Sequence, residues 1–248
     1  MRRVFLALLA AVSFGSVQAG FAADMPLKAP PPPAPVFSWT GFYVGINGGD
    51  GWGTSSSNSN FSLVGTSFNL PIASQGISGW LGGFQAGYNW QTGVIVFGVE
   101  GDFDFADIEG NTACLVVFNC NAKQDWVADV TARLGVTPFD RLLMYVKGGV
   151  AWADDKFSFG NSFTAGGTTV AINASASETR VGGIMGMGVE YAFMPHWSAK
   201  IEYNFIDFGT DTLGFPLTTT PAIAGLPTVQ TQIKQTESLM KAGLNYRF

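Results

Sequence analysis

The sequence predicts an all-β fold: an eight-stranded antiparallel up-and-down transmembrane β-barrel with long extracellular loops and short periplasmic turns. Three observations predict it. Apolar residues alternate with polar or small ones in eight segments, and these segments are longer than ordinary strands of about five or six residues. Long and short links alternate between them, which places every long loop at one end of the array.

The alternating segments hold about 11 to 16 residues, enough for tilted strands that cross a membrane. They span residues 39–49, 78–91, 94–105, 125–136, 142–153, 179–193, 197–208 and 233–248. Short turns are expected at 92–93, 137–141 and 194–196, and long loops at about 50–77, 106–124, 154–178 and 209–232. The long links are rich in Ser, Thr, Asn, Gly and Pro, as surface loops are.

Two segments precede the predicted barrel. Residues 1–23 have the form of a signal peptide, with Arg2 and Arg3 before an apolar run and small residues offering cleavage between about 19 and 23. Residues 24–38 include four consecutive prolines and are expected to form an extended periplasmic spacer. The barrel is predicted over 39–248, and no segment after residue 24 is long and apolar enough for a transmembrane helix.

Composition excludes some classes of function. The formal net charge is -5 and no basic stretch is present, so nucleic-acid binding is not expected. Cys114 and Cys120 are the two cysteines, and in an exported chain their spacing favours a small disulfide loop, with two free thiols as the alternative.

Alternation assigns the side chains to two faces. One face is almost uncharged, and its aromatic residues gather near the strand ends. The other face carries the ionisable groups predicted to form a lumen charge network: Glu100, Asp102, Asp104, Asp129, Arg133, Lys147, Arg180, Glu190, Lys200, Glu202, Lys241 and Arg247. In a soluble ligand-binding barrel the uncharged face would line the cavity. The aromatic residues near the strand ends and the many glycines on the charged face favour a membrane barrel, with the charges inside.

An eight-stranded barrel is narrow enough for side chains to fill it, and six acids against six bases can pair there. A filled lumen argues against a wide diffusion pore and favours a structural envelope barrel, which would act as a surface antigen through its long loops. A porin with a narrow pore for small solutes or ions is the alternative.

Enzymatic activity is not expected. Hydrolysis needs a base beside a nucleophile, and His196, the one histidine, lies in the turn "MPHW" at the end away from the long loops, where a turn residue explains it better. Asp102 and Asp104 are the alternative bases, and lumen ion pairs explain them better. The acidic run "DFDFAD" at 102–107 is better explained by lumen ion pairs than by a cation, so neither a metal nor another cofactor is predicted.

The signal ending in "AAD", the spacer "LKAPPPPAP", the first strand "WTGFYVGINGG" and the terminal "AGLNYRF" resemble the small outer-membrane immunogenic proteins, or porin family. The resemblance covers the whole mature chain. It implies the eight-stranded fold of the transmembrane domain of outer-membrane protein A, in the outer membrane of a Gram-negative bacterium. It also implies a surface-exposed protein that supports the envelope.

The last strand ends in Leu244, Tyr246 and Phe248 on the lipid-facing side, a pattern that resembles the signal read by the barrel-assembly machinery. The expected partners are therefore this machinery during insertion, outer-membrane lipid and lipopolysaccharide, and host or surface ligands at the long loops.

Overall fold

The computed structural model describes residues 37–63, 66–114, 118–165, 168–220 and 228–248. The signal peptide and most of the spacer lie outside these residues. Residues Val36–Phe248 form one compact unit, and its described residues lie almost entirely in strands. In the described part of the chain, no helix is long and apolar enough to cross a membrane.

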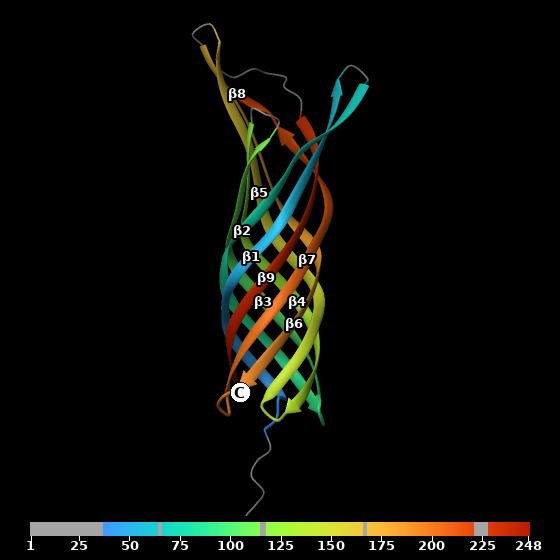
Figure 1. The fold of residues 1–248 in the computed structure, drawn as a ribbon, viewed down its shortest axis with the longest axis vertical. Coiled ribbons are helices and arrows are strands. Elements are labelled where there is room, and N and C mark those ends of the chain that lie inside the picture. Colours follow the sequence, from blue (N-terminus) through green and yellow to red (C-terminus); the bar gives the residue numbers. More distant parts are fainter. Residues whose placement is uncertain (1–36, 64–65, 115–117, 166–167, 221–227) are drawn as a thin grey trace, which may run out of the picture. The chain divides into compact units, whose positions relative to one another are not determined.

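Eight long strands form a closed antiparallel ring (Figure 1). They are β1 (Gly41–Leu63), β2 (Thr66–Thr92), β3 (Ile95–Cys114), β4 (Phe118–Phe139), β5 (Leu142–Ala165), β6 (Thr168–Ala192), β7 (Trp197–Pro216) and β9 (Thr228–Arg247). Each pairs with the next, and β1 pairs with β9 from Tyr43↔Arg247 onward, so the ring is closed. The ladder between β6 and β7 covers only Gly183↔Asp207 to Ala192↔Ser198. The short β8 (Thr218–Thr220) pairs with residues 171–173 of β6, beyond the end of the β6–β7 ladder. The predicted fold class is confirmed.

The short turns lie where the sequence places them. Gly93, with a φ of 61°, occupies the turn between β2 and β3, since only glycine adopts this left-handed conformation at no cost. Asp140 and Arg141 connect β4 to β5, and residues 193–196 connect β6 to β7. The carboxyl terminus lies at this same end of the barrel (Figure 1).

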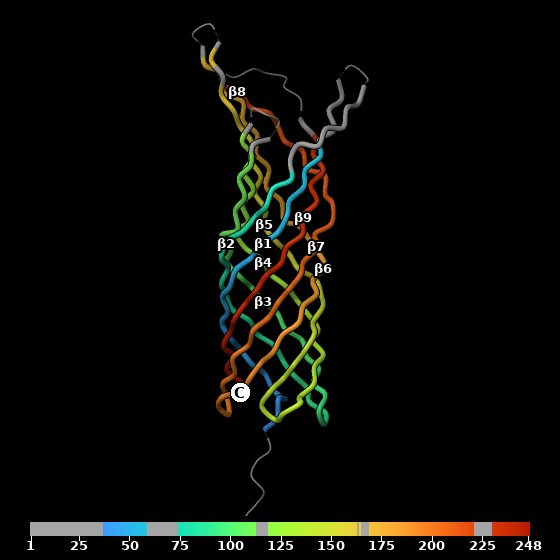
Figure 2. Tube along the Cα trace, viewed as in Figure 1, coloured from blue at the N-terminus to red at the C-terminus, as the bar shows by residue number. Residues whose placement is uncertain are grey.

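The predicted long loops are wrong in extent. β1 and β2 run 23 and 27 residues, and their ladder continues to Leu63↔Thr66. β3 with β4, β5 with β6, and β7 with β9 also extend beyond their predicted ends. Figure 2 shows these tilted strands continuing toward the end opposite the carboxyl terminus. The reason is that Ser- and Thr-rich sequence with alternate inward apolar residues can continue a ladder.

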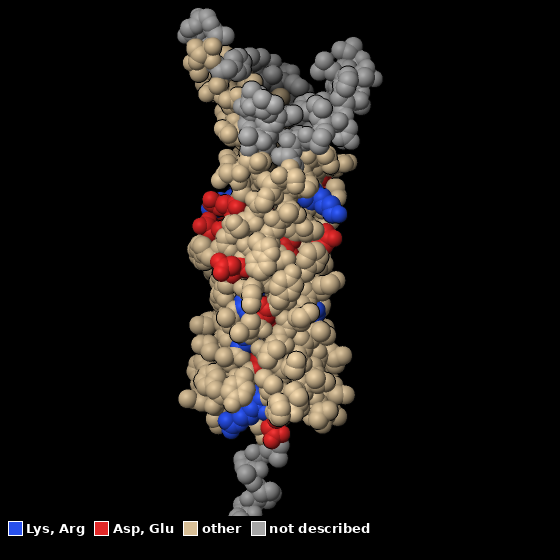
Figure 3. All heavy atoms as spheres, in the orientation of Figure 1, with Lys and Arg blue, Asp and Glu red and all other residues tan. Residues whose placement is uncertain are grey.

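The outer surface divides into two zones. Large apolar side chains point outward in alternate positions of residues 42–52, 80–90, 95–105, 126–136, 144–152, 181–191, 197–205 and 240–248, here called the outer belt. Asp50, beside Trp52, is the charged exception in these positions. On the extended side of the belt lies an outer charged band of Asp107, Glu109, Lys123, Asp125, Asp154, Lys156 and Glu178. Figure 3 shows charged atoms gathered above a largely uncharged region on one face.

The interior has a matching division. Inward side chains of the extended part and of the adjoining end of the belt form an apolar core of Ile77, Leu81, Ala106, Ile108, Ala122, Val127, Ala151, Ala153, Phe157, Ala174, Ile184, Ile206, Phe208, Leu213, Phe215, Ile233 and Leu239. A smaller cluster of Trp39, Val96, Leu143, Tyr145 and Ala192 fills the end with the short turns. The buried charges of the belt region lie between these two clusters along the strands.

Candidate functional site

Lys147 is the centre of the buried charges inside the belt. Its Nζ lies 2.7 Å from Glu202 Oε1 and 3.4 Å from Glu100 Oε1. It also lies 3.6 Å from Asp102 Oδ2 and 3.8 Å from Asp129 Oδ1. β5 directs Lys147 inward because alternate residues of a strand face the same side. One ammonium group therefore joins carboxylates from three other strands.

Two further lysines extend this arrangement. Lys200 Nζ lies 3.1 Å from both carboxylate oxygens of Glu100 and also pairs with Glu202. Lys241 on β9 pairs with Asp102 and Asp104 on β3, at 3.0 Å each. β3 and β9 are not neighbours in the ring, so these ion pairs cross the interior.

Arg133 closes the group on the side of the short turns. Its Nη1 lies 3.3 Å from Glu100 Oε2 and 3.6 Å from Glu190 Oε2. Its guanidinium also lies over the rings of Tyr43 and Tyr145, at 4.6 and 5.1 Å from their centroids. We call the connected set the ion-pair network: Glu100, Asp102, Asp104, Asp129, Arg133, Lys147, Glu190, Lys200, Glu202 and Lys241.

Two predicted members of the lumen network lie elsewhere. Arg180 pairs with Asp155 and Asp211 beyond the outer belt. Arg247 lies at the rim, where it donates a 2.9 Å hydrogen bond to Pro195 O and stacks over Phe37 at 4.2 Å from the ring centroid. The network thus holds more carboxylates than bases, in contrast to the balanced set expected from the sequence.

Neutral donors offset this imbalance. Tyr43 donates a 2.7 Å hydrogen bond to Glu100, and Asn245 donates a 2.9 Å bond to Glu190, which Ser198 also contacts. Asn47 lies 3.5 Å from Asp102. Sequence reasoning missed these residues because they are uncharged, although Ser198 and Asn245 are in phase with the inward charged positions of their strands. Tyr43 and Asn47 lie on β1, which has no inward charge to mark its phase.

A second polar cluster lies among the apolar core residues and was also missed. Gln124 donates a 2.9 Å hydrogen bond to Glu237, and Gln235 contacts both Glu237 and Asp155. Arg180 donates to Gln235 Oε1 at 3.3 Å. Asp155 fell in a predicted loop, whereas Glu237 could have been found because it is in phase with Lys241 on the last strand.

Glycines make room for the bulky inward groups. A Cβ at Gly87 would lie 2.2 Å from the hydroxyl oxygen of Tyr43, and one at Gly186 would lie 2.1 Å from Asn204 Oδ1. Any larger residue at these positions would displace the polar side chains opposite.

Trp39 fills the barrel at the end with the short turns. Its side chain is 1% exposed and packs with Val96, Leu143 and Ala192. Its backbone N–H donates a 2.6 Å hydrogen bond to Gln91 Oε1, which fixes the chain ahead of β1 against β2.

The terminal residues Leu244 and Phe248 point outward, and Tyr246 contacts Phe248 with ring centroids 5.2 Å apart. Phe248 N–H donates to Phe42 O at 3.1 Å, which holds the end of the chain on β1. His196 Nδ1 lies 2.8 Å from Arg247 O, so this contact joins the turn between β6 and β7 to the end of β9.

Cys120 is disulfide-bonded, and no cysteine is free among the described residues. The side chain of Cys114 lies outside the described part, so its pairing with Cys120 stays a prediction. In the same described residues, no group of three or more His, Cys, Asp or Glu side chains could hold a metal ion.

The outer charged band also contains ion pairs, but these are exposed. Lys123 Nζ bridges Asp107 and Glu109 at 2.7 and 2.8 Å. The hydrogen bond from Lys123 holds the pKa of Asp107 below its ordinary value, and the same two carboxylates raise the pKa of Lys123.

Residues 7–248 match the family model of the outer membrane protein β-barrel domain. The chain belongs to this outer-membrane β-barrel family. It is 32% identical to the 31 kDa outer-membrane immunogenic protein of Brucella melitensis over 262 residues, covering 100% of both chains. It is 28% identical over 179 residues to the 22 kDa outer membrane protein of Rhizobium leguminosarum bv. viciae, covering 71% of this chain and 68% of that protein. The predicted family and outer-membrane localisation are confirmed.

Solved structures agree on the fold of this barrel family. The outer membrane protein OprG from Pseudomonas aeruginosa has a TM-score of 0.55 at 12% identity, with 87% of this chain and 100% of that chain covered. The outer membrane protease OmpT from Escherichia coli has a TM-score of 0.50 at 10% identity, with 87% and 99% covered. At such identities the likeness shows the fold alone, so the protease activity of one neighbour does not transfer to this chain.

Proposed function

We propose that this chain is a non-enzymatic structural barrel and surface antigen whose interior is closed to solutes. The observation that carries the proposal is the continuous filling of the interior. Trp39 is 1% exposed at one end, Lys147 is 5% exposed within the ion-pair network, and Ile206 is 0% exposed in the apolar core. A solute would have to displace all three layers.

The antigenic role rests on the immunogenic relatives together with the long strands that extend beyond the outer belt. These strands present their outward side chains to the medium. The envelope role rests on the closed ring and the filled interior, which make the barrel a rigid component of the outer membrane.

Recording from the folded protein in planar bilayers tests the closed interior. We expect no stepwise conductance from protein whose folding is verified by heat-modifiable migration on gels. A general porin reconstituted in the same way serves as the positive control. Reproducible conductance steps would overturn the proposal in favour of a narrow pore.

Deletion of the gene tests the envelope role. We expect the deletion strain to be more sensitive to detergent and to chelators, with resistance restored by the wild-type gene. Unchanged sensitivity would remove the envelope role and leave the antigenic one.

A further inference from the structure

Glu237 is a buried carboxyl group in the extended part of the barrel. Its side chain on β9 is 1% exposed, and Gln124, Asp155 and Gln235 around it are each 2% exposed. β9 is not a neighbour of β4 or β5 in the ring, so the contacts among these residues cross the interior. Together with Arg180 on β6 they form what we call the Glu237 cluster: Gln124, Asp155, Arg180, Gln235 and Glu237.

The cluster holds more carboxylates than cations. Arg180 Nη1 lies 3.8 Å from Asp155 Oδ2, while its Nε donates a 3.1 Å hydrogen bond to Asp211 Oδ2. Its other donors reach Gln235 and two backbone carbonyl oxygens of β7 and β9. Among the ion pairs of the described residues, none includes Glu237.

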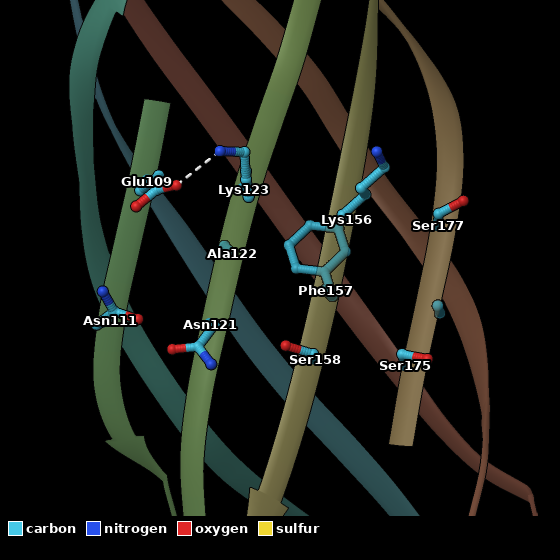
Figure 4. Close-up of a pocket in the computed structure, with 11 residues that line it drawn as sticks. Glu109, Asn111, Asn121, Ala122, Lys123, Lys156, Phe157, Ser158, Ser175 and Ser177 are labelled. Atoms are coloured by element: carbon cyan, nitrogen blue, oxygen red, sulfur yellow. Dashed lines mark hydrogen bonds and ion pairs between the residues drawn. The ribbon is translucent and has the colours of Figure 1, made fainter. Parts of the chain in front are cut away.

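The lysines of β4, β5 and β9 do not compensate Glu237 either. Lys147 and Lys241 belong to the ion-pair network inside the belt. The remaining ones have outward side chains: Lys123, Lys156 and Lys234. Figure 4 shows Lys123 and Lys156 on this outer face, with the hydrogen bond from Lys123 to Glu109. An ionised Glu237 would therefore be a buried charge without a counter-ion, which is strongly unfavourable.

The cluster also lacks a hydrogen-bond donor. Glu237 Oε1 accepts hydrogen bonds from Gln124 Nε2 at 2.9 Å and from Gln235 Nε2 at 2.5 Å. Three buried oxygen atoms have no hydrogen-bond partner in the described part of the chain: Glu237 Oε2, Asp155 Oδ2 and Gln124 Oε1. A proton on Glu237 adds one O–H donor to this set of acceptors and removes the uncompensated charge at the same time.

The electrostatics of the cluster agree with its geometry. Burial, together with the charge of Asp155, raises the pKa of Glu237 to about 8. Burial also raises the pKa of Asp155 to about 6, although the nearby Arg180 lowers it. Both carboxyl groups lie beyond the outer belt along their strands. At pH 7 the proton of the cluster therefore resides on Glu237.

We propose that the Glu237 cluster is a pH-sensitive switch that stabilises the extended part of the barrel while Glu237 is protonated. In this state its hydrogen bonds join β9 to β4 and β5 across the interior. In an alkaline medium the proton leaves, and the strands around the unpaired carboxylate separate to admit water. This inference goes beyond the closed structural barrel, because it concerns the stability of the part outside the membrane and does not depend on whether the interior conducts.

Infrared spectroscopy of the folded, full-length mature protein in lipid vesicles tests the protonation. We expect the wild type at pH 7 to show a carboxylic-acid C=O band that Glu237→Gln lacks, and this band to disappear with a midpoint near pH 8. The difference between the two proteins isolates Glu237 from the other acids of the interior. The matched control, Glu178→Gln on the outer face of β6, should keep the band. Identical spectra of the wild type and Glu237→Gln in this region would overturn the proposal.

Amide hydrogen exchange tests the effect on stability. A raised carboxyl pKa gives stability that is complete below the ordinary value of 4.5 and is lost as the pH rises to about 8. We expect protection factors in the extended parts of β4, β5 and β9 to fall by up to about tenfold per pH unit between about pH 6 and 8, and then to level off. The belt region should keep its protection. In Glu237→Gln the fall should be absent, because the neutral amide does not titrate.

Asp155→Asn separates an electrostatic role from a merely structural one, and it also serves if Glu237→Gln does not fold. It removes the charge that raises the pKa of Glu237, so the midpoint of the infrared band should move to lower pH. Heat-modifiable migration verifies the fold of each variant. An unchanged midpoint in Asp155→Asn, or an equal fall of protection in the wild type and Glu237→Gln, would contradict the switch. Conductance through the protein would overturn the closed interior and leave these results unaffected.

Discussion

The belt region lies within the outer belt, and the extended region is the part of the barrel where the strands continue beyond that belt. The two regions have opposite polarity: their apolar and charged faces are exchanged. Within the belt, Val146 points outward and Lys147 inward, whereas a few residues along the same strand Lys156 points outward and Phe157 inward. The strand geometry is the same in both regions. The difference teaches that the surrounding solvent, lipid in one case and water in the other, selects which face is apolar.

The two interiors are also held together by different forces. The ion-pair network removes charges from water at a cost, so its stability depends on every partner being present. The apolar core gains from burial and depends on volume and packing. Breaking one member of each region therefore tests the comparison directly.

The largest effect is expected for Lys147→Met. The substitution keeps much of the side-chain volume but removes the one cation that contacts Glu100, Asp102 and Glu202 together, leaving them only Lys200 and Lys241. We expect the free energy of unfolding to fall by about 3–5 kcal/mol, measured by urea titration of the protein in lipid vesicles. Lys234→Met, on the exposed face, is the control. An unchanged unfolding midpoint would show that the network does not stabilise the belt region.

The next effect is expected for Ile206→Ala in the apolar core. Ile206 is 0% exposed, and removing its methyl groups leaves a cavity that costs about 3 kcal/mol. Ile201→Ala on the same strand is the control, because Ile201 is 58% exposed on the outer belt and its loss leaves no cavity. Equal losses in the two variants would contradict a packed core in the extended region.

A smaller loss is expected for Val146→Lys on the outer surface. Val146 points outward near the middle of the belt on β5, where a lysine in lipid costs about 2–3 kcal/mol. Ser162→Lys lies on the same face of β5 beyond the belt and should be neutral. The free energies of unfolding of the two variants in vesicles show which position lies in lipid. Equal losses would contradict a lipid boundary between Val146 and Ser162.

The smallest effect is expected for Lys123→Gln in the outer charged band. The pKa of Asp107 is held low by the hydrogen bond from Lys123, so it should rise toward the ordinary value of about 3.9 in an NMR titration. A lowered carboxyl pKa stabilises the fold above that ordinary value, and the contribution is lost as the pH falls through the lowered pKa.

Because these side chains are exposed to water, we expect no measurable change in unfolding for Lys123→Gln. Lys234→Gln should leave the Asp107 titration unaltered. A titration of Asp107 that is identical in the wild type and in Lys123→Gln would show that the bridge does not persist in solution.

The sequence was sufficient to predict the strands of the belt region, their phase and their turns. Period-two alternation and the short links at Gly93 and His196 are local signals, and they need no knowledge of distant partners. The same alternation continued through the extended strands, but with Ile108 and Phe157 inward and charges outward. Because strands were expected to have their apolar residues facing lipid, segments with apolar residues inward and charges outward were taken for loops.

The sequence by itself determined the membrane-facing surface and the inward direction of the network residues, because both follow from alternation along single strands. Its motifs also carried the resemblance to the family. Only the tertiary structure decided which charges meet. Lys241 reaches Asp102 across the ring, while Arg180 joins Asp155 and Arg247 stacks on Phe37. The physical reason is that the register between strands and their tilt set the height of each side chain, and neither quantity is present in one strand alone.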